Sequence, residues 1–238
     1  VAARLLSPAL QLVSILPDEE SPVSFRFETE GEVITFEQGR LVIDIEVEEK
    51  GPAVLGDPLE IVDGAIAAGS NEHGIAAELF TITSERNATL EVTEDTGELC
   101  VSGVLEPVLD GDFATQWGAI FGLAFVGDDG EATPWDRDGG SVDGFAFTIT
   151  GPAIPPMRFG ALAGDGDPEA DSFCAPFASS SGGTLEISID QMTRDCWIPG
   201  GESLITPTLS NIIWNMPTDT FATQEYDFCI GDLRPILR

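Results

Sequence analysis

A group of acidic residues in the middle of the chain has the composition of a cation-binding loop. Asp136, Asp138 and Asp143 follow one another closely, and Gly140 between them allows a tight turn. Calcium takes six to eight hard oxygen ligands, which loop carboxylates and backbone carbonyls supply. The stretch lacks the full EF-hand pattern with its terminal Glu. It predicts a calcium site, and the alternative interpretation is a solvated acidic turn.

Residues suited to catalysis are sparse. His73 is the only histidine, so a zinc centre built on several histidines is excluded. The sequence contains neither an HExxH motif nor a GxSxG motif, which carry metalloprotease and serine-hydrolase chemistry. A glycosidase needs only two carboxylates at a set separation, so the abundance of Asp and Glu leaves that enzyme class open. We expect a protein without catalytic activity.

The charge of the chain restricts its partners. It has 42 acidic and 10 basic residues, which give a formal net charge of −32. Such a surface repels nucleic acid and anionic lipid and attracts cations, of which calcium is the first to expect. The alternative is that the acidity reflects only a salt-rich habitat of the source. No segment has the roughly 20 consecutive apolar residues that span a bilayer, so we expect no membrane insertion.

The four cysteines predict a compartment. Cys100, Cys174, Cys196 and Cys229 have neither CxxC spacing nor a histidine partner, so they indicate two disulfides and not a zinc site. Their spacing leaves all three pairings open. Disulfides persist in oxidising environments, which predicts a secreted protein, extracellular or on the cell surface.

The elements that must position these residues are strands. In residues 41–48, Leu, Ile and Val alternate with Asp and Glu, which is typical of a half-buried strand. Similar segments occur at 80–83, 90–92, 100–105, 145–149, 185–189 and 226–230. Clusters of Gly and Asp separate them, and the run 60–77 has room for one short helix. The pattern predicts an all-β fold, an antiparallel β-sandwich of the jelly-roll kind.

The chain is expected to form one sandwich over residues 1–238, with an N-terminal arm at 1–22. An alternative boundary near residue 95 follows from composition, because every Cys and every Trp lies after it. No linker rich in Pro, Gly and Ser supports that boundary. The apolar segment 1–16 is expected to be an edge strand or a short helix laid on the core, and the alternative is a strand that pairs with the sheet edge of another subunit.

Four strand patterns carry a resemblance to a known fold: 99–103, 116–119, 142–149 with 157–159, and 226–233. Residues from about 90 to 238 resemble the galactose-binding-like jelly-roll domains of secreted bacterial proteins, which include many carbohydrate-binding modules. The resemblance implies disulfides between Cys174 and Cys196 and between Cys100 and Cys229. It also implies a structural calcium held by Asp232 in the last strand, with Glu37 or Glu28 as an early acidic partner.

The resemblance further implies a sugar-binding site. Proteins bind sugars by stacking an aromatic ring on the apolar face of a pyranose and by hydrogen bonds to its hydroxyls. The candidate ligand-binding residues are Trp135, Trp214, Asn215, Tyr226, Gln116 and Arg158. Trp214 is expected on a sheet face and Trp135 at a loop rim, whereas Trp117 and Trp197 are expected in the core. The alternative for each Trp is a buried role between the sheets.

These observations predict a lectin-like protein that binds a polysaccharide or glycan. The alternative function is a structural subunit of an extracellular fibre, coat or surface layer, assembled from copies of itself through the N-terminal arm and calcium. The first hypothesis requires Trp135 or Trp214 to be exposed in a groove. The second requires residues 1–16 to lie on a neighbour's sheet edge.

Overall fold

The structure, a computed structural model, divides into two compact units, 1–50 and 51–238, and each is taken by itself. It describes residues 28–29, 32–33, 54–84, 86–127, 129–136, 142–164, 172–177, 182–194, 196–197, 201–204 and 208–237. The described part of the first unit is a short hairpin of β1 (Glu28–Thr29) and β2 (Glu32–Val33). The N-terminal arm, the strand predicted at 41–48, Glu37 and Asp138 lie outside the described residues.

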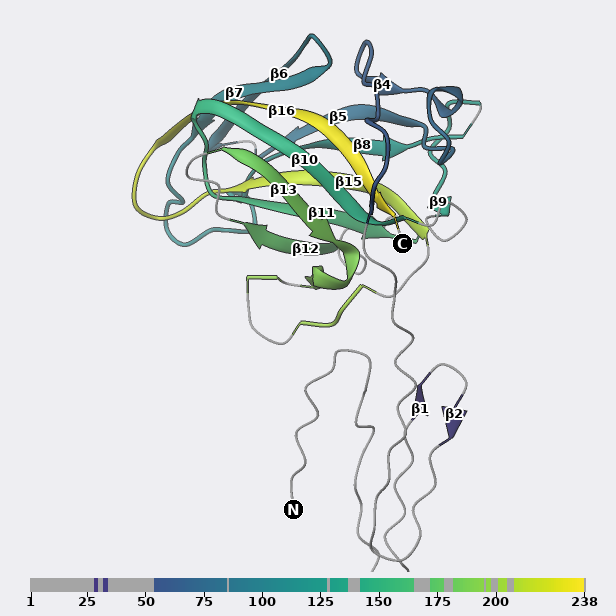
Figure 1. Cartoon of the computed structure of the whole chain (residues 1–238). Helices are drawn as coiled ribbons and strands as arrows, with labels where there is room; N and C mark the ends of the chain where they lie inside the picture. Colours follow the sequence, from purple (N-terminus) through teal and green to yellow (C-terminus); the bar gives the residue numbers. More distant parts are fainter. Residues whose placement is uncertain are drawn as a thin grey trace, which may run out of the picture. The chain divides into compact units, whose positions relative to one another are not determined.

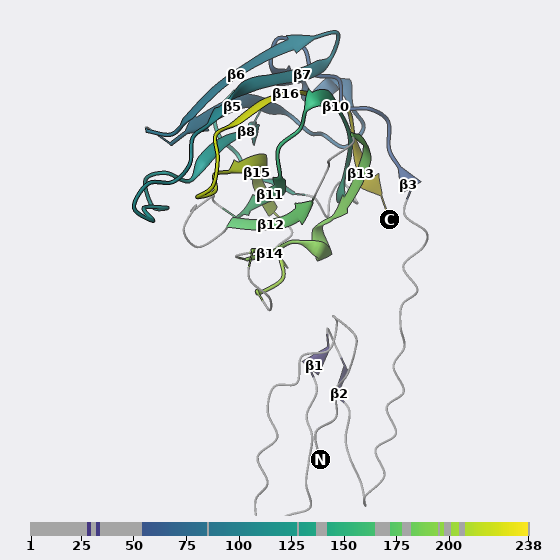
Figure 2. The same ribbon diagram turned by 90° about the vertical axis from the view of Figure 1, so that its left-hand side faces the viewer.

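The second unit is built from two antiparallel sheets (Figure 1). One contains, in spatial order, β13 (Gly183–Ser188), β10 (Val142–Ala153), β16 (Gln224–Leu237), β7 (Glu98–Leu105) and β6 (Ala88–Asp95), with β3 (Val54–Leu55) also paired to β16. The other contains β14 (Thr193–Arg194), β12 (Ser172–Phe177), β11 (Met157–Ala163), β15 (Thr208–Pro217), β8 (Gly118–Phe125), β5 (Ala77–Thr83) and β4 (Ala65–Ile66), with β9 (Trp135–Asp136) paired to β15. Figure 2 shows the sheets as two layers. The predicted antiparallel jelly-roll sandwich is confirmed.

Helix is confined to two single turns within the described residues. They are the 3-10 helices η1 (Ala68–Ser70) and η2 (Ile189–Gln191). The first is the short helix expected in the run 60–77, and the second contains Ile189, which was predicted to end a strand. No helix in the described part of the chain has the length and apolar character needed to cross a membrane.

The alternative boundary near residue 95 is wrong. It falls at the end of β6, which pairs with β7 from Ala88 opposite Leu105 to Asp95 opposite Glu98. β5, also before the boundary, pairs along its length with β8. Strands from both sides of residue 95 therefore belong to the same sheets.

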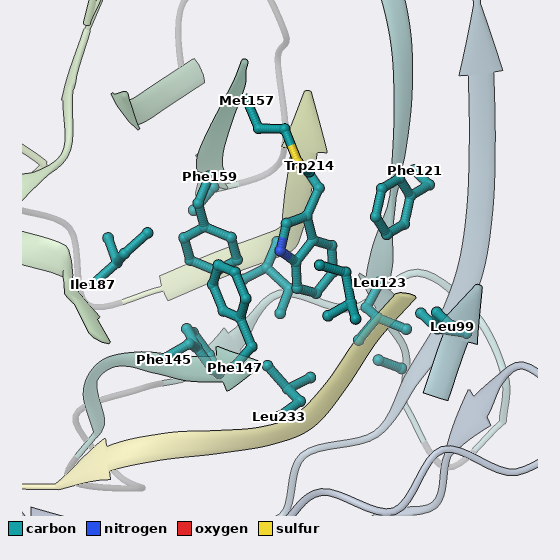
Figure 3. Close-up of a cluster of buried hydrophobic side chains, with 14 of the residues drawn as sticks. Leu99, Phe121, Leu123, Phe145, Phe147, Met157, Phe159, Ile187, Trp214 and Leu233 are labelled. Atoms are coloured by element: carbon teal, nitrogen blue, oxygen red, sulfur yellow. The ribbon is translucent and has the colours of Figure 1, made fainter. Parts of the chain in front are cut away.

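The core lies between the sheets because alternate side chains of each strand point inward. In β16, Tyr226, Phe228 and Ile230 are buried, and in β8 Phe121 and Leu123 are buried. Trp214 of β15 is at the centre of this cluster (Figure 3). Its indole stacks on Phe121, with ring centroids 5.2 Å apart, and meets Phe147 and Phe159 edge-on at 5.4 and 5.3 Å. Phe147 belongs to the facing sheet, so Trp214 joins the two layers.

Both predicted disulfides are present. Cys100 and Cys229 are directly opposite each other on β7 and β16, and their sulfurs are bonded. Leu99 and Val101 are buried, so alternation places this disulfide on the outer face of its sheet. Cys174 of β12 is bonded to Cys196, which follows β14. The pairing implied by the resemblance is confirmed.

We predict that Trp214→Ala lowers the free energy of unfolding by about 3–5 kcal/mol, because it removes a large ring from a fully buried site and leaves a cavity. Urea denaturation followed by circular dichroism measures the change. Trp197→Ala is the matched control, since Trp197 is 58% exposed and its loss should change stability by about 0.5 kcal/mol or less. Equal losses in the two variants would contradict the central position of Trp214.

Candidate binding face on the eight-stranded sheet

Three predicted ligand-binding side chains are structural instead. Trp214, expected on a sheet face, is 0% exposed, because its position in β15 points inward. Tyr226 is also buried, and its hydroxyl donates a hydrogen bond to the carbonyl of Thr89. Gln116 is buried too; its Oε1 accepts from the Leu109 amide at 2.9 Å and its Nε2 donates to the Leu109 carbonyl at 3.3 Å. None of the three has a surface on which a sugar could stack.

Trp135 is half-buried and closes one end of the core. Its indole Nε1 donates a hydrogen bond to the carbonyl of His73 at 3.2 Å. Its ring lies against Phe125, with centroids 5.4 Å apart, and near Phe145 at 6.4 Å. The hydrogen bond to His73 and the contacts with Phe125 and Phe145 thus already engage the ring. Trp135 is therefore not the exposed ring at a loop rim that the prediction requires.

Trp197 is the exposed tryptophan, although the sequence analysis placed it in the core. Its side chain is 58% exposed, and its backbone follows Cys196, which is bonded to Cys174 of β12. The guanidinium carbon of Arg158 lies 4.7 Å from the centroid of its ring, in cation–π contact. A covalent bond on one side and Arg158 on the other hold this ring at the sheet. Trp117, also expected in the core, is half-buried.

Strand register aligns Arg158, which contacts the Trp197 ring, with a row of side chains across the sheet. Arg158 of β11 is paired with Asn215 of β15, Asn215 with Ile120 of β8, and Ile120 with Ile82 of β5. Their neighbours Phe159, Trp214 and Phe121 point into the core, so these four side chains project outward. We call Arg158, Asn215, Ile120 and Ile82 the outer row.

A second row beside it is apolar and flat. It consists of Gly160, Ile213, Gly122 and Phe80, paired in this order across the same four strands. A Cβ on Gly122 would lie only 3.0 Å from both the Ile213 side chain and the Phe80 ring, and one on Gly160 would lie 3.2 Å from Ile213. The two glycines therefore let Ile213 and Phe80 lie along the sheet. We call these four residues the apolar row.

The two polar side chains of the outer row, Arg158 and Asn215, are both partly buried. Burial lowers the pKa of the Arg158 guanidinium below its ordinary value; the group still carries its charge at neutral pH. The Asn215 Oδ1 is buried and accepts no hydrogen bond within the described part of the chain. A buried acceptor without a donor costs free energy. The face thus combines an aromatic ring, a guanidinium, an unused amide acceptor and a flat apolar strip.

Within the described part of the second unit, Asp136, Asp143 and Asp232 do not form a group of three potential metal ligands. The Asp232 carboxylate accepts hydrogen bonds from Arg234, from Nη2 at 2.8 Å and from Nε at 2.9 Å. Asp136 ends β9, and Asp143 lies in β10. Among the described residues, the potential metal-binding group is Glu98, Cys100 and Cys229, whose sulfurs are joined in a disulfide. Calcium binding stays a prediction, resting on the acidic loop.

Comparison with known proteins gives similarity of structure alone. No family model matches the sequence, and no curated protein matches it. A family 11 carbohydrate-binding module of a cellulosomal cellulase of Clostridium thermocellum has a TM-score of 0.45 and 16% identity, covering 79% of this chain and 96% of the module. The Clostridium thermocellum family 11 module in complex with a β-1,3-1,4-mixed-linked tetrasaccharide has a TM-score of 0.46 and 15% identity, covering 78% and 98%. A family 29 module has a TM-score of 0.41 and 10% identity, covering 78% and 86%.

If the acidic loop binds calcium, EDTA should lower the melting temperature and added calcium should restore it. Binding to the folded state adds about 2.7 kcal/mol when free calcium is 100 times the dissociation constant. Differential scanning calorimetry across EDTA and calcium checks this, and Asp143→Asn should weaken the response. A melting temperature that is the same in EDTA and in calcium would contradict the prediction of a stabilising calcium site.

Tyr226 provides a second measurement, because it is the only tyrosine in the chain. Burial raises its pKa from about 10 to about 12 in the folded protein. The folded state therefore holds the phenol proton more tightly than the unfolded state, and this part of the stability is complete below pH 10 and is lost as pH rises from 10 to 12. Absorbance titration at the phenolate band should give a midpoint near 12 in the native protein. A native midpoint equal to that in urea would show that the phenol is not buried.

Proposed function

We propose that this chain is a secreted, non-catalytic carbohydrate-binding protein, and that its ligand lies on the outer face of the eight-stranded sheet. The observation that carries the proposal is the exposed ring of Trp197, held over Arg158 beside the outer and apolar rows. The predicted function is retained, with its binding residues moved from Trp214 and Tyr226 to Trp197.

The ring has the properties that sugar stacking requires. The C–H groups on one face of a pyranose are apolar, and they pack against an aromatic ring that keeps one face or edge toward solvent. Trp197 is 58% exposed, whereas the other tryptophans are half-buried or fully buried. Anchoring by the disulfide and by Arg158 reduces the conformational entropy that the ring would lose on binding.

The two rows supply the remaining parts of a sugar site. Arg158 has five N–H donors for hydroxyl oxygens, and the paired Asn215 has a buried acceptor that no described residue uses. The apolar row offers the half-buried Phe80 ring as a surface on which a further sugar ring can lie, whereas Ile213 beside it in the row is only 8% exposed. A few polar groups set in a mainly apolar surface are the usual composition of a ligand site.

Absence of catalysis and secretion are supported by different features. Neither row contains a carboxylate, whereas glycoside hydrolysis needs a pair of acids. The four cysteines form two disulfides and leave no free thiol. Disulfides are typical of proteins outside the cytosol.

A glycan array followed by isothermal titration calorimetry tests the proposal. Trp197→Ala should weaken binding of each glycan retained by the native chain at least about tenfold, or about 1.4 kcal/mol. Phe221→Ala is the matched control, because Phe221 is an aromatic residue that is 88% exposed on the β15–β16 loop; its loss should leave affinity unchanged.

Two results would contradict this function. Glycan binding that survives Trp197→Ala would move the site elsewhere. No glycan binding, together with a large assembly by native mass spectrometry, would favour the structural subunit considered from the sequence.

A further inference from the structure

We propose that the ligand is a largely neutral polysaccharide bearing widely spaced carboxylate groups, such as uronic acid side groups, and that Arg158 binds the carboxylate. This inference rests on the proposed function and specifies its ligand.

The other described arginines already have acidic neighbours. Arg234 forms an ion pair with Asp232 at 2.8 Å, and Arg194 lies 3.8 Å from Glu202. Arg86 is exposed, and its charge adds to the hydrogen bonds from Thr115 that lower the pKa of the Asp112 carboxyl. In a chain with 42 acidic and 10 basic residues, such pairing is the expected state of an arginine.

Arg158 differs from them. Its guanidinium lies over the Trp197 ring, and no ion pair joins it to a carboxylate of the described residues. Burial is the cause that acts on its pKa, which is lowered, whereas the Asp232 carboxylate raises the pKa of Arg234. Arg158 is thus a partly desolvated cation on the candidate binding face without an anionic partner in the described structure.

A carboxylate is the group that such a cation binds best. A guanidinium has two parallel N–H donors that match the two oxygens of a carboxylate, and charge-assisted hydrogen bonds are about twice as strong as neutral ones. A guanidinium stacked on an indole keeps its N–H groups at its rim, where an acceptor beside the ring can reach them. A sugar stacked on Trp197 would bring its substituents to that rim.

The total charge limits how many carboxylates the ligand can carry. A net charge of −32 repels a dense polyanion over about 8 Å at physiological salt. The outer row contains one cation, Arg158, and the apolar row contains none. One cation within a repulsive field selects a single carboxylate on an otherwise neutral chain and disfavours a continuous polyuronate.

Matched pairs of polysaccharides test the inference. Xylan and xanthan, both with uronic acid side groups, are each compared by calorimetry with the same polymer after chemical reduction of its carboxyl groups, and polygalacturonate serves as the dense polyanion. We expect at least one native polymer to bind about tenfold more tightly than its reduced form, and polygalacturonate to bind more weakly than that polymer.

Two variants test whether Arg158 causes the preference for the native polymer over its reduced form. Arg158→Gln keeps hydrogen-bond donors but removes the charge, so affinity for the native polymer should fall to that for the reduced one. Arg86→Gln removes an arginine away from this face and should leave both affinities unchanged. Circular dichroism and thermal melting establish that each variant is folded.

The outcomes separate this inference from the proposed function. Equal binding of native and reduced polymers, or a preference that survives Arg158→Gln, overturns the carboxylate inference and leaves carbohydrate binding in place. Tighter binding of polygalacturonate than of either side-chain polymer overturns the requirement for spaced carboxylates. Failure to bind any polymer here or any glycan on the array overturns the proposed function itself.

Discussion

The packing of Trp214 between the two sheets is the contact on which the rest of the described sandwich depends. Its ring meets Phe121 from β8, Phe159 from β11 and Phe147 from the facing sheet. Successive side chains of a strand point to opposite faces, and a slip of one residue would reverse them all. Fixing Trp214 on the inside therefore fixes Ile213 and Asn215 on the outside. The same strand register therefore determines which side chains form the core and which form the candidate binding face.

Several strands after residue 76 were predictable because one face of each is buried, whereas β12 and β15 were not among the predicted strands. Residues 100–105 and 226–230 alternate clearly, and the structure places both in paired strands of one sheet. The order of strands depends on contacts between distant parts of the chain, which a local pattern does not encode. The disulfide pairing likewise came from resemblance and not from the spacing of the cysteines.

The candidate site was predicted in part. Arg158 and Asn215 were among the predicted ligand-binding residues, and the structure places both on the face that we propose. Trp214 was placed on the wrong side because residues 211–215, Asn-Ile-Ile-Trp-Asn, contain apolar side chains of both parities, so alternation does not distinguish inside from outside. Trp197 was placed in the core because it follows a disulfide-bonded cysteine. The stretch Trp-Ile-Pro-Gly-Gly at 197–201 was the missed signal, since Pro and Gly mark a turn and a turn exposes its side chains.

The disulfide between Cys174 and Cys196 spans 22 residues and attaches the Trp197 segment to an inner strand of its sheet. The Trp214 cluster contains no sulfur from this bridge, so the two depend on different chemistry. A thiol that reduced this bridge would remove the covalent link of the Trp197 segment to β12 and leave it held by the β12–β14 pairing and Arg158, while the layers stayed packed. The redox state of the surroundings would then act on the proposed recognition surface separately from the fold, and a folded chain in a reducing compartment would hold the Trp197 ring less firmly than the same chain with the bridge intact.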